Sequence, residues 1–182
     1  MKKLLLSICI FSFAISYLYS QAPSYKDFEW DIIKLGYVIP GGDDYSDGRL
    51  VGGEFRLNLR DDLSIGLRTE SVVFDHNFGE EIDVDATWSW AATSDYYWNT
   101  TSAYRAFTGI GFGSFRSGNI TEDDGDIIIT EGSTSTGILA RIGYEYNHLR
   151  ISAEYNMMLE DNATNYFTLC AAFTLWGGYK GF

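Results

Sequence analysis

The sequence has little cysteine, little proline and a shortage of positive charge. Its two cysteines are Cys9 and Cys170, and removal of the first 20 residues would leave only Cys170, which excludes an intramolecular disulfide. Only two prolines occur, and the chain contains no low-complexity tract or sequence repeat. Lys and Arg number 13 against 25 Asp and Glu, a net charge of -12. This acidic balance argues against nucleic acid as a partner.

No apolar run is long enough to cross a membrane as a helix, including the run at the N-terminus. There, Lys2 and Lys3 precede an apolar stretch that ends near Ile15, short of the roughly 20 residues a membrane helix needs. With Ser20 as the small residue that follows, this pattern predicts a secretory signal peptide over residues 1–20, removed near Ser20. The remaining residues, 21–182, are enough for one domain.

What the sequence has in quantity is strand-forming residues, among them 13 Tyr, 12 Phe and five Trp. Apolar and polar residues alternate in eight segments, which predicts eight strands. The segments cover residues 29–39, 49–60, 63–74, 82–98, 103–115, 136–146, 149–158 and 166–176. Short and long connections alternate between them, so all tight turns would lie at one end of an antiparallel barrel and all long loops at the other.

Charged residues keep to one face of these segments. In residues 149–158, Arg150, Ser152, Glu154 and Asn156 alternate with apolar residues. Alternation alone does not say which face is inside, because a soluble lipocalin-like barrel would place the apolar face inward. Charge pairing favours a polar interior, since buried charges need partners whereas exposed ion pairs contribute only about 0 to 1 kcal/mol.

Turn geometry predicts which charges are partners. A two-residue turn at Asn147 and His148 places Glu145 opposite Arg150 and Arg141 opposite Glu154. The turn near NTTS is expected to place Asp95 opposite Arg105. The RDDL turn is expected to place Glu54 opposite Glu70, leaving two complementary diagonals, Glu54 with Arg68 and Arg56 with Glu70. Gly109, Gly111 and Gly113 share this polar face and would leave room for the arginines.

Aromatic residues concentrate at the ends of the apolar face, as in the aromatic girdles of membrane barrels. At the short-turn end these are Phe28, Trp30, Tyr96, Trp98, Tyr104, Tyr144, Tyr146, Trp176 and Tyr179, and at the long-loop end Tyr37, Phe74, Phe78, Phe115, Tyr155 and Phe167. The sequence therefore predicts an all-β fold, an eight-stranded antiparallel up-and-down transmembrane β-barrel with short periplasmic turns and longer external loops.

From Gln21 to Phe182 the chain resembles the small bacterial outer-membrane β-barrel proteins of the OmpA and OmpX type. The resemblance rests on the strand pattern, the charged lumen and the terminal aromatic residue Phe182, not on an exact motif. It implies location in the bacterial outer membrane, contact with its lipid, and recognition of Phe182 by the barrel-assembly machinery. One departure is that counting back by twos from Phe182 reaches Lys180, Gly178 and Trp176, which would require a bulge at Gly177 and Gly178.

The sequence offers little catalytic chemistry, and we expect no enzyme activity, no cofactor and no metal. His148 lies in a predicted turn and His76 in a predicted external loop, and no His-x-Ser pair of the lipid A deacylase kind is present. Cys170 is expected to point into the lumen as a packing residue. The acidic long loops would either bind divalent cations beside anionic lipid or form a solvated surface, and TEDDGD does not have the spacing of an EF-hand loop.

The leading hypothesis is a non-enzymatic barrel with a structural or surface-interaction role, which could be a small subunit of a larger outer-membrane complex. A narrow channel or small-molecule transporter, a lipid-modifying enzyme and a soluble lipocalin-like binding barrel are the alternatives. Because the sequence ends at Phe182, no peptidoglycan-binding domain is expected after the barrel.

The longest predicted loop contains an apolar run, Ile127, Ile128 and Ile129. If this run extends the sixth segment, the strand reaches from about Asp126 to Tyr146, roughly twice the length that a bilayer requires. It would then form a hairpin extension outside the barrel, and could also present an edge or an apolar patch to a protein partner.

Overall fold

The computed structural model describes residues 25–41, 46–78, 81–100, 103–123, 126–160 and 164–180. Within these ranges the side chains of residues 75–85 and 119–131 are not described. The predicted signal peptide and Phe182 lie outside the described residues. None of the described residues forms a helix long and apolar enough to cross a membrane.

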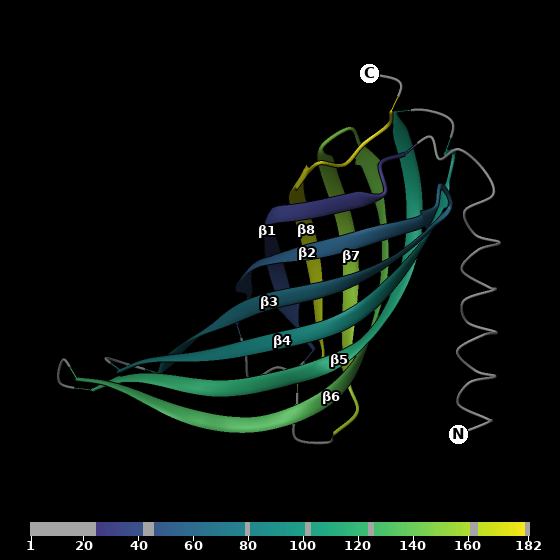
Figure 1. Cartoon of the computed structure of the whole chain (residues 1–182). Coiled ribbons are helices and arrows are strands. Elements are labelled where there is room, and N and C mark those ends of the chain that lie inside the picture. Colours follow the sequence, from purple (N-terminus) through teal and green to yellow (C-terminus); the bar gives the residue numbers. More distant parts are fainter. Residues whose placement is uncertain are drawn as a thin grey trace, which may run out of the picture.

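Eight antiparallel strands close into one barrel, in which each strand pairs with its neighbours in sequence and β1 pairs with β8 (Figure 1). Closure gives every strand a hydrogen-bonding partner on both sides over the barrel body, so the body has no free sheet edge. The strands are β1 (Phe28–Pro40), β2 (Gly48–Arg60), β3 (Leu63–Phe78), β4 (Glu81–Trp98), β5 (Tyr104–Asp123), β6 (Asp126–Tyr146), β7 (Leu149–Met158) and β8 (Tyr166–Leu175). The predicted eight-stranded up-and-down barrel is confirmed.

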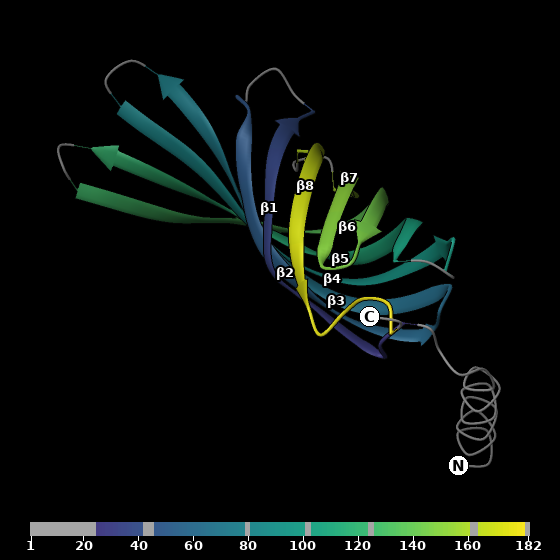
Figure 2. The ribbon, with the colours of Figure 1, turned by 90° about the horizontal axis from the view of Figure 1, so that it is seen from above.

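Strands β3 to β6 are much longer than the others and continue together beyond the barrel body (Figures 1 and 2). The stretch after Arg116, expected as a loop, is a hairpin in which Ile120 pairs with Ile129 and Asp123 with Asp126. The β4 strand pairs alongside this hairpin as far as Ile82 opposite Glu122. Thus the isoleucine run does extend the strand to Asp126, and the extension is part of a four-stranded sheet.

The two-residue turn at Asn147 and His148 sets the register of β6 and β7 as the sequence predicted. Asn147 adopts a φ of 52°, the left-handed conformation that Asn tolerates in tight turns. Glu145 lies opposite Arg150 and Arg141 opposite Glu154.

The registers expected at the other two turns are wrong. Asp95 lies opposite Gly109, not Arg105, and Glu54 lies directly opposite Arg68, not Glu70. A slip by an even number of residues leaves every side chain on its own face, so alternation fixes the face but not the partner. At the β2–β3 turn the slip coincides with an irregularity between Asn58 and Arg60.

Polar side chains fill the barrel and apolar ones cover it. Arg56, Arg68 and Arg105 are fully buried, whereas Trp88 and Ile110 are 58% and 67% exposed. The lipocalin-like alternative, which needs the apolar face inside, does not fit this arrangement. Ten of the aromatic residues expected at the strand ends are exposed: Phe28, Trp30, Tyr37, Tyr96, Trp98, Tyr104, Tyr144, Tyr146, Tyr155 and Trp176.

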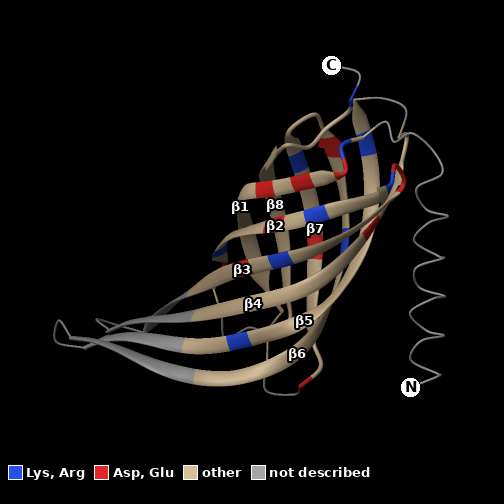
Figure 3. Cartoon of the chain, viewed as in Figure 1, with Lys and Arg blue, Asp and Glu red and all other residues tan. Residues whose placement is uncertain are grey.

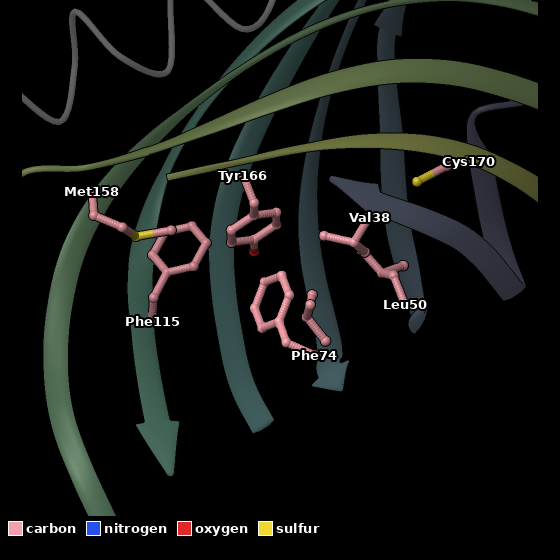
Figure 4. Packing of buried hydrophobic residues seen from close by; sticks show 8 residues of the cluster. Val38, Leu50, Phe74, Phe115, Met158, Tyr166 and Cys170 are labelled. Carbon is pink, nitrogen blue, oxygen red and sulfur yellow. The ribbon is translucent and has the colours of Figure 1, made fainter. Parts of the chain in front are cut away.

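Phe74 and Phe115, expected on the outer face, point inward instead. They are 3% and 2% exposed and pack against Tyr166, with ring centroids 6.0 and 6.5 Å from its ring (Figure 4). Both share the alternation of the lumen charges, so the inner face changes from charged to apolar toward the long-loop end. The apolar cap, as we call this cluster, consists of Val38, Leu50, Val72, Phe74, Phe115, Met158, Tyr166 and Cys170.

Closure of the barrel gives the first prediction. Because every strand of the barrel body is hydrogen-bonded on both sides, the detergent-folded protein should resist SDS until it is heated. It should then migrate differently on a gel before and after boiling. Identical migration of the two samples, together with solubility in the absence of detergent, would contradict the closed barrel with an apolar exterior.

Candidate functional site

Charged residues occur on several strands of the barrel body (Figure 3). The buried ones, from β1 to β7, form a network in the lumen next to the apolar cap. Each of these side chains is at most 9% exposed. The acids are Glu29, Asp31, Glu54, Glu70, Asp95, Glu145 and Glu154, and the bases are Lys34, Arg56, Arg68, Arg105, Arg141 and Arg150. We call this set the lumen charge network.

At the short-turn end, Glu145 is the shared acceptor of three arginines. Arg56 and Arg150 both donate to its Oε1, Arg56 at 2.5 Å, and Arg105 donates to its Oε2 at 2.6 Å. Arg105 also donates to both carboxylate oxygens of Glu29, at 2.8 Å each. Charge-assisted bonds of this kind are the strong ones in an interior of low dielectric constant.

Arg141 occupies the middle of the network and joins β6 to β2 and β4. Its two terminal nitrogens donate to Glu54 at 2.6 and 2.7 Å. Its Nε donates to Asp95 at 2.7 Å. Arg150 donates to the second oxygen of Asp95, also at 2.7 Å, so Asp95 links the middle layer to the short-turn layer.

Lys34 and Glu154 lie at the centre of the third layer, next to the apolar cap. Lys34 Nζ lies 2.5 Å from Glu70 and 2.7 Å from Glu154. Arg68 donates to Glu154 at 2.8 Å and to Asn156 at 2.9 Å. The charged side chains of the three layers come from β1 to β7, and Thr174 of β8 joins them by donating to Asp31 at 2.5 Å.

Aromatic rings complete the short-turn end. The guanidinium of Arg105 lies between Tyr25 and Tyr97, 4.0 and 3.6 Å from the two ring centroids, and Arg150 lies 3.6 Å above the Phe107 ring. Such stacking stabilises a cation that has lost its water. Tyr25 precedes β1 and is 2% exposed, so it closes the lumen at this end.

Only some of the predicted ion pairs are present in the structure. Glu145 and Arg150 form an ion pair across β6 and β7. Arg141 lies opposite Glu154 in register, but its ion pairs are with Glu54 and Asp95.

The pairs expected at the other turns are replaced by different ones. Asp95 bonds with Arg141 and Arg150, and Arg105 with Glu29 and Glu145. In the β2–β3 hairpin, Arg56 bonds with Glu29, Asp31 and Glu145, while Arg68 bonds with Glu70 and Glu154. Arginine reaches across the lumen as well as to the adjacent strand, so nearest-neighbour register does not identify its partner.

Sequence reasoning missed the contribution of β1, namely Glu29, Asp31 and Lys34. The register of β1 shifts between Asp31 and Lys34, and both residues of the bulge, Ile32 and Ile33, are exposed. The bulge moves the inward face from odd to even positions. The signal available in the sequence was the pair of adjacent isoleucines between charged residues, which breaks the alternation.

Gly109 makes room for the middle layer. A Cβ at this position would collide with Asp95 Oδ1 and would lie 2.9 Å from Arg141 Nε. At Gly111 and Gly113 the atoms nearest to an added side chain include those of Leu139 and Ala91. The expected role of these glycines in leaving space for an arginine therefore applies at Gly109.

The remaining candidate residues lie away from this network or outside the described side chains. His148 has a hydrogen bond between Nδ1 and the Thr174 carbonyl oxygen at 2.7 Å and stacks on Phe173. Cys170 is buried in the apolar cap. The side chains of His76 and of Ile127, Ile128 and Ile129 are not described. Over the described residues, no group of three or more His, Cys, Asp or Glu is arranged to hold a metal ion.

Comparison with known proteins identifies the fold. No family model and no curated protein matches the chain. Neisserial surface protein A matches with a TM-score of 0.59 at 15% identity, over 83% of this chain and 97% of the other. The fold is that of the small outer-membrane β-barrels.

Two further structures have this outer-membrane barrel fold. Ail, the attachment invasion locus protein of Yersinia pestis, was solved with the heparin analogue sucrose octasulfate and matches with a TM-score of 0.51 at 12% identity, over 85% of this chain and 100% of the other. The outer membrane protein OprG of Pseudomonas aeruginosa matches with a TM-score of 0.51 at 14% identity, over 87% and 97%. Eight strands enclose a lumen that side chains can fill, as they do here.

The lumen charge network gives the second prediction. Arg141→Ala should lower the free energy of unfolding by about 3–5 kcal/mol, because Glu54 and Asp95 would stay buried without their main cation. Glu54→Gln in that background should recover part of the loss. Urea unfolding of the barrel in lipid vesicles would measure both effects as a double-mutant cycle.

Two variants serve as controls for this cycle. Glu154→Gln should couple to Arg141→Ala more weakly than Glu54→Gln does, because Glu154 bonds with Lys34 and Arg68. Arg60→Ala, at an exposed ion pair with Asp62, should change the free energy by no more than about 1 kcal/mol. Stronger coupling to Glu154 than to Glu54 would contradict the observed partners.

Proposed function

We propose that this chain is an exported, non-enzymatic outer-membrane barrel with a closed lumen and a structural or surface-interaction role. The observation that carries the proposal is the combination of an apolar exterior with a lumen filled by mutually bonded, buried charges. An apolar exterior requires lipid or a partner around the barrel. A lumen filled in this way favours a role in stabilising the barrel over a role in passing ions or small molecules through it.

The exterior supports insertion in a bilayer. Large apolar residues are exposed on all sides of the barrel, including Leu35 on β1, Leu67 on β3, Phe112 on β5 and Ile151 on β7. The aromatic residues exposed at the short-turn end fit one membrane–water interface. In this orientation the short turns face the periplasm and the β3–β6 extension lies outside the cell. The predicted signal peptide would direct export of the chain, and Phe182 would be the signal that the barrel-assembly machinery recognises.

The filled lumen favours a closed barrel over a channel. Arg56, Arg68, Arg105 and Glu154 are at most 1% exposed, and each bonds with partners on other strands. The apolar cap covers this network toward the outside. An enzyme is also less well supported, because the described side chains supply one histidine, His148, which is bonded to a backbone carbonyl.

The third prediction concerns conduction. The folded protein in planar bilayers should show negligible conductance, because the lumen charge network fills the lumen below the apolar cap. Phe115→Ala should leave this unchanged, since it removes cap volume without touching the charges. Stable open pores of defined size in the unmodified protein would overturn the closed-lumen proposal.

The β3–β6 extension supports the surface-interaction role. Pairing of β7 with β6 begins at Gly137, whereas β5 pairs with β6 as far as Asp126. Over the part of the chain that the structure describes, the outer half of β6 is therefore paired on one side. Such an edge accepts an added strand from a partner, and acidic residues along the extension oppose self-association. The partner would be another subunit of an outer-membrane complex or an external protein.

The fourth prediction tests this edge. Ile127→Lys combined with Ile129→Lys should leave gel mobility before and after boiling unchanged but should reduce co-purification of a partner in mild detergent. Ser133→Lys, at an exposed position of the same strand, is the matched control and should keep the partner. Recovery of the same partners with the isoleucine variant would remove the hypothesis that this run forms the contact.

A further inference from the structure

A pocket opens on the outer rim of the barrel at the short-turn end. It has a volume of about 540 Å³ and is lined by Lys26, Asp27, Phe28, Phe55, Trp176 and Lys180. We call it the rim pocket. Its residues come from the segment before β1, from β1 and β2, and from the segment after β8, which meet at this end of the barrel (Figure 1).

Backbone bonds hold both lysine-bearing segments in place. Lys26 N donates to Gly178 O at 3.2 Å, and Tyr25 pairs with Tyr179 in an isolated β-bridge. Asn58 of β2 fixes the first segment from the other side, because its Nδ2 donates to Lys26 O at 2.7 Å and its N donates to the carbonyl oxygen of the next residue at 2.8 Å. The rim pocket is therefore preformed, which reduces the entropy lost when a ligand binds.

The charge of the pocket differs from that of the chain. Lys26 and Lys180 face one acid, Asp27, whose Oδ1 lies 3.2 Å from Lys180 Nζ. The lining residues therefore carry one net positive charge in a chain whose net charge is -12. Six of the other bases are buried in the lumen charge network, and Arg60 at the same end is paired with Asp62.

The backbone conformation of Trp176 is a second unusual feature of the rim pocket. Its φ is 54°, in the left-handed region that bulky residues rarely adopt, whereas the other described non-glycine residues with positive φ are Asn99 and Asn147. The ring is 63% exposed and lies 5.9 Å from the ring of Trp30. A backbone conformation of this cost is retained where the surrounding structure and function require it. Here it places an indole on the rim beside two lysines.

We propose that the rim pocket binds the phosphate headgroup of an anionic glycerophospholipid in the periplasmic leaflet. Lys26 and Lys180 would bind the phosphate, while Phe28, Phe55 and Trp176 contact the glycerol and the upper acyl chains. Exposed indole rings lie at the headgroup level of membranes, and basic pockets at this level bind anionic headgroups. The inference rests on the membrane orientation given under the proposed function. It adds a specific lipid contact to that orientation.

The test uses the chain folded into nanodiscs of phosphatidylcholine with a minor share of phosphatidylglycerol. Native mass spectrometry of the released protein counts the lipids that stay bound. Phosphatidylglycerol should be retained in preference to phosphatidylcholine. Lys26→Gln combined with Lys180→Gln should weaken this retention roughly 10- to 30-fold, as expected for two lysines near an anionic surface. Arg60→Gln, which removes a paired base at the same end, should leave it unchanged.

Trp176→Asn separates lipid binding from folding. Asn tolerates the left-handed conformation, so gel mobility before and after boiling should not change, whereas retention of phosphatidylglycerol should fall. Unchanged retention in this variant would contradict the role of the indole.

Three other results would overturn the proposal. Equal retention of the two lipids would exclude a headgroup site. A loss in Arg60→Gln equal to that in the double lysine variant would show that retention depends on general surface charge. Competition by soluble glycerol 3-phosphate at the lipid's own concentration would show a phosphate site that does not depend on the membrane. Failure of the chain to fold in nanodiscs would instead refute the proposed function itself, so the two failures are distinguishable.

Discussion

The rest of this structure depends on one constraint, that charges removed from water must have partners. An uncompensated charge in the lumen would cost more than most single apolar contacts contribute. The lumen charge network meets this constraint by sharing: Glu145 accepts from three arginines, and Arg141 is held by two acids on different strands. Each bond therefore joins strands that are distant in sequence. Backbone hydrogen bonds close the barrel, and the bonds of the lumen charge network hold its strands in one register.

Local irregularities of the chain help the buried charges to reach their partners. The bulge at Ile32 and Ile33 turns Lys34 inward, where it lies between Glu70 and Glu154. Gly109 leaves the space that Arg141 needs beside Asp95. Toward the long-loop end the charges stop and the apolar cap begins, so water is kept from the network on that side. A closed and rigid barrel of this kind can anchor the β3–β6 extension, whose outer part lies beyond the barrel body.

Much of the fold could be predicted from the sequence because alternation assigns each residue to a face. Alternation gave the eight strands and the charged interior, and the Asn147 turn gave the register of β6 and β7. It could not distinguish registers that differ by an even number of residues, which is why Asp95 was placed opposite Arg105 and Glu54 opposite Glu70. It also could not show that arginine reaches across the lumen, as Arg141 does to Glu54. It also assumes that alternation is unbroken, so the bulge hid Glu29, Asp31 and Lys34. Phe74 and Phe115 were placed on the outer face because they are aromatic and lie near strand ends, although alternation puts both on the charged face.

The distribution of basic residues links the interior to the surface. The interior takes six of the 13 Lys and Arg together with seven acids, and is close to neutral. The excess of negative charge therefore lies outside the lumen, in the connections and in the extension. This surface repels anionic lipid wherever it approaches the membrane. At the short-turn end the exposed bases Lys26, Arg60 and Lys180 lie among the acids Asp27, Asp61 and Asp62, so the rim pocket is a local positive site on a surface that is acidic as a whole. Burying six bases to hold the barrel together therefore leaves few bases to offset the acids outside the lumen.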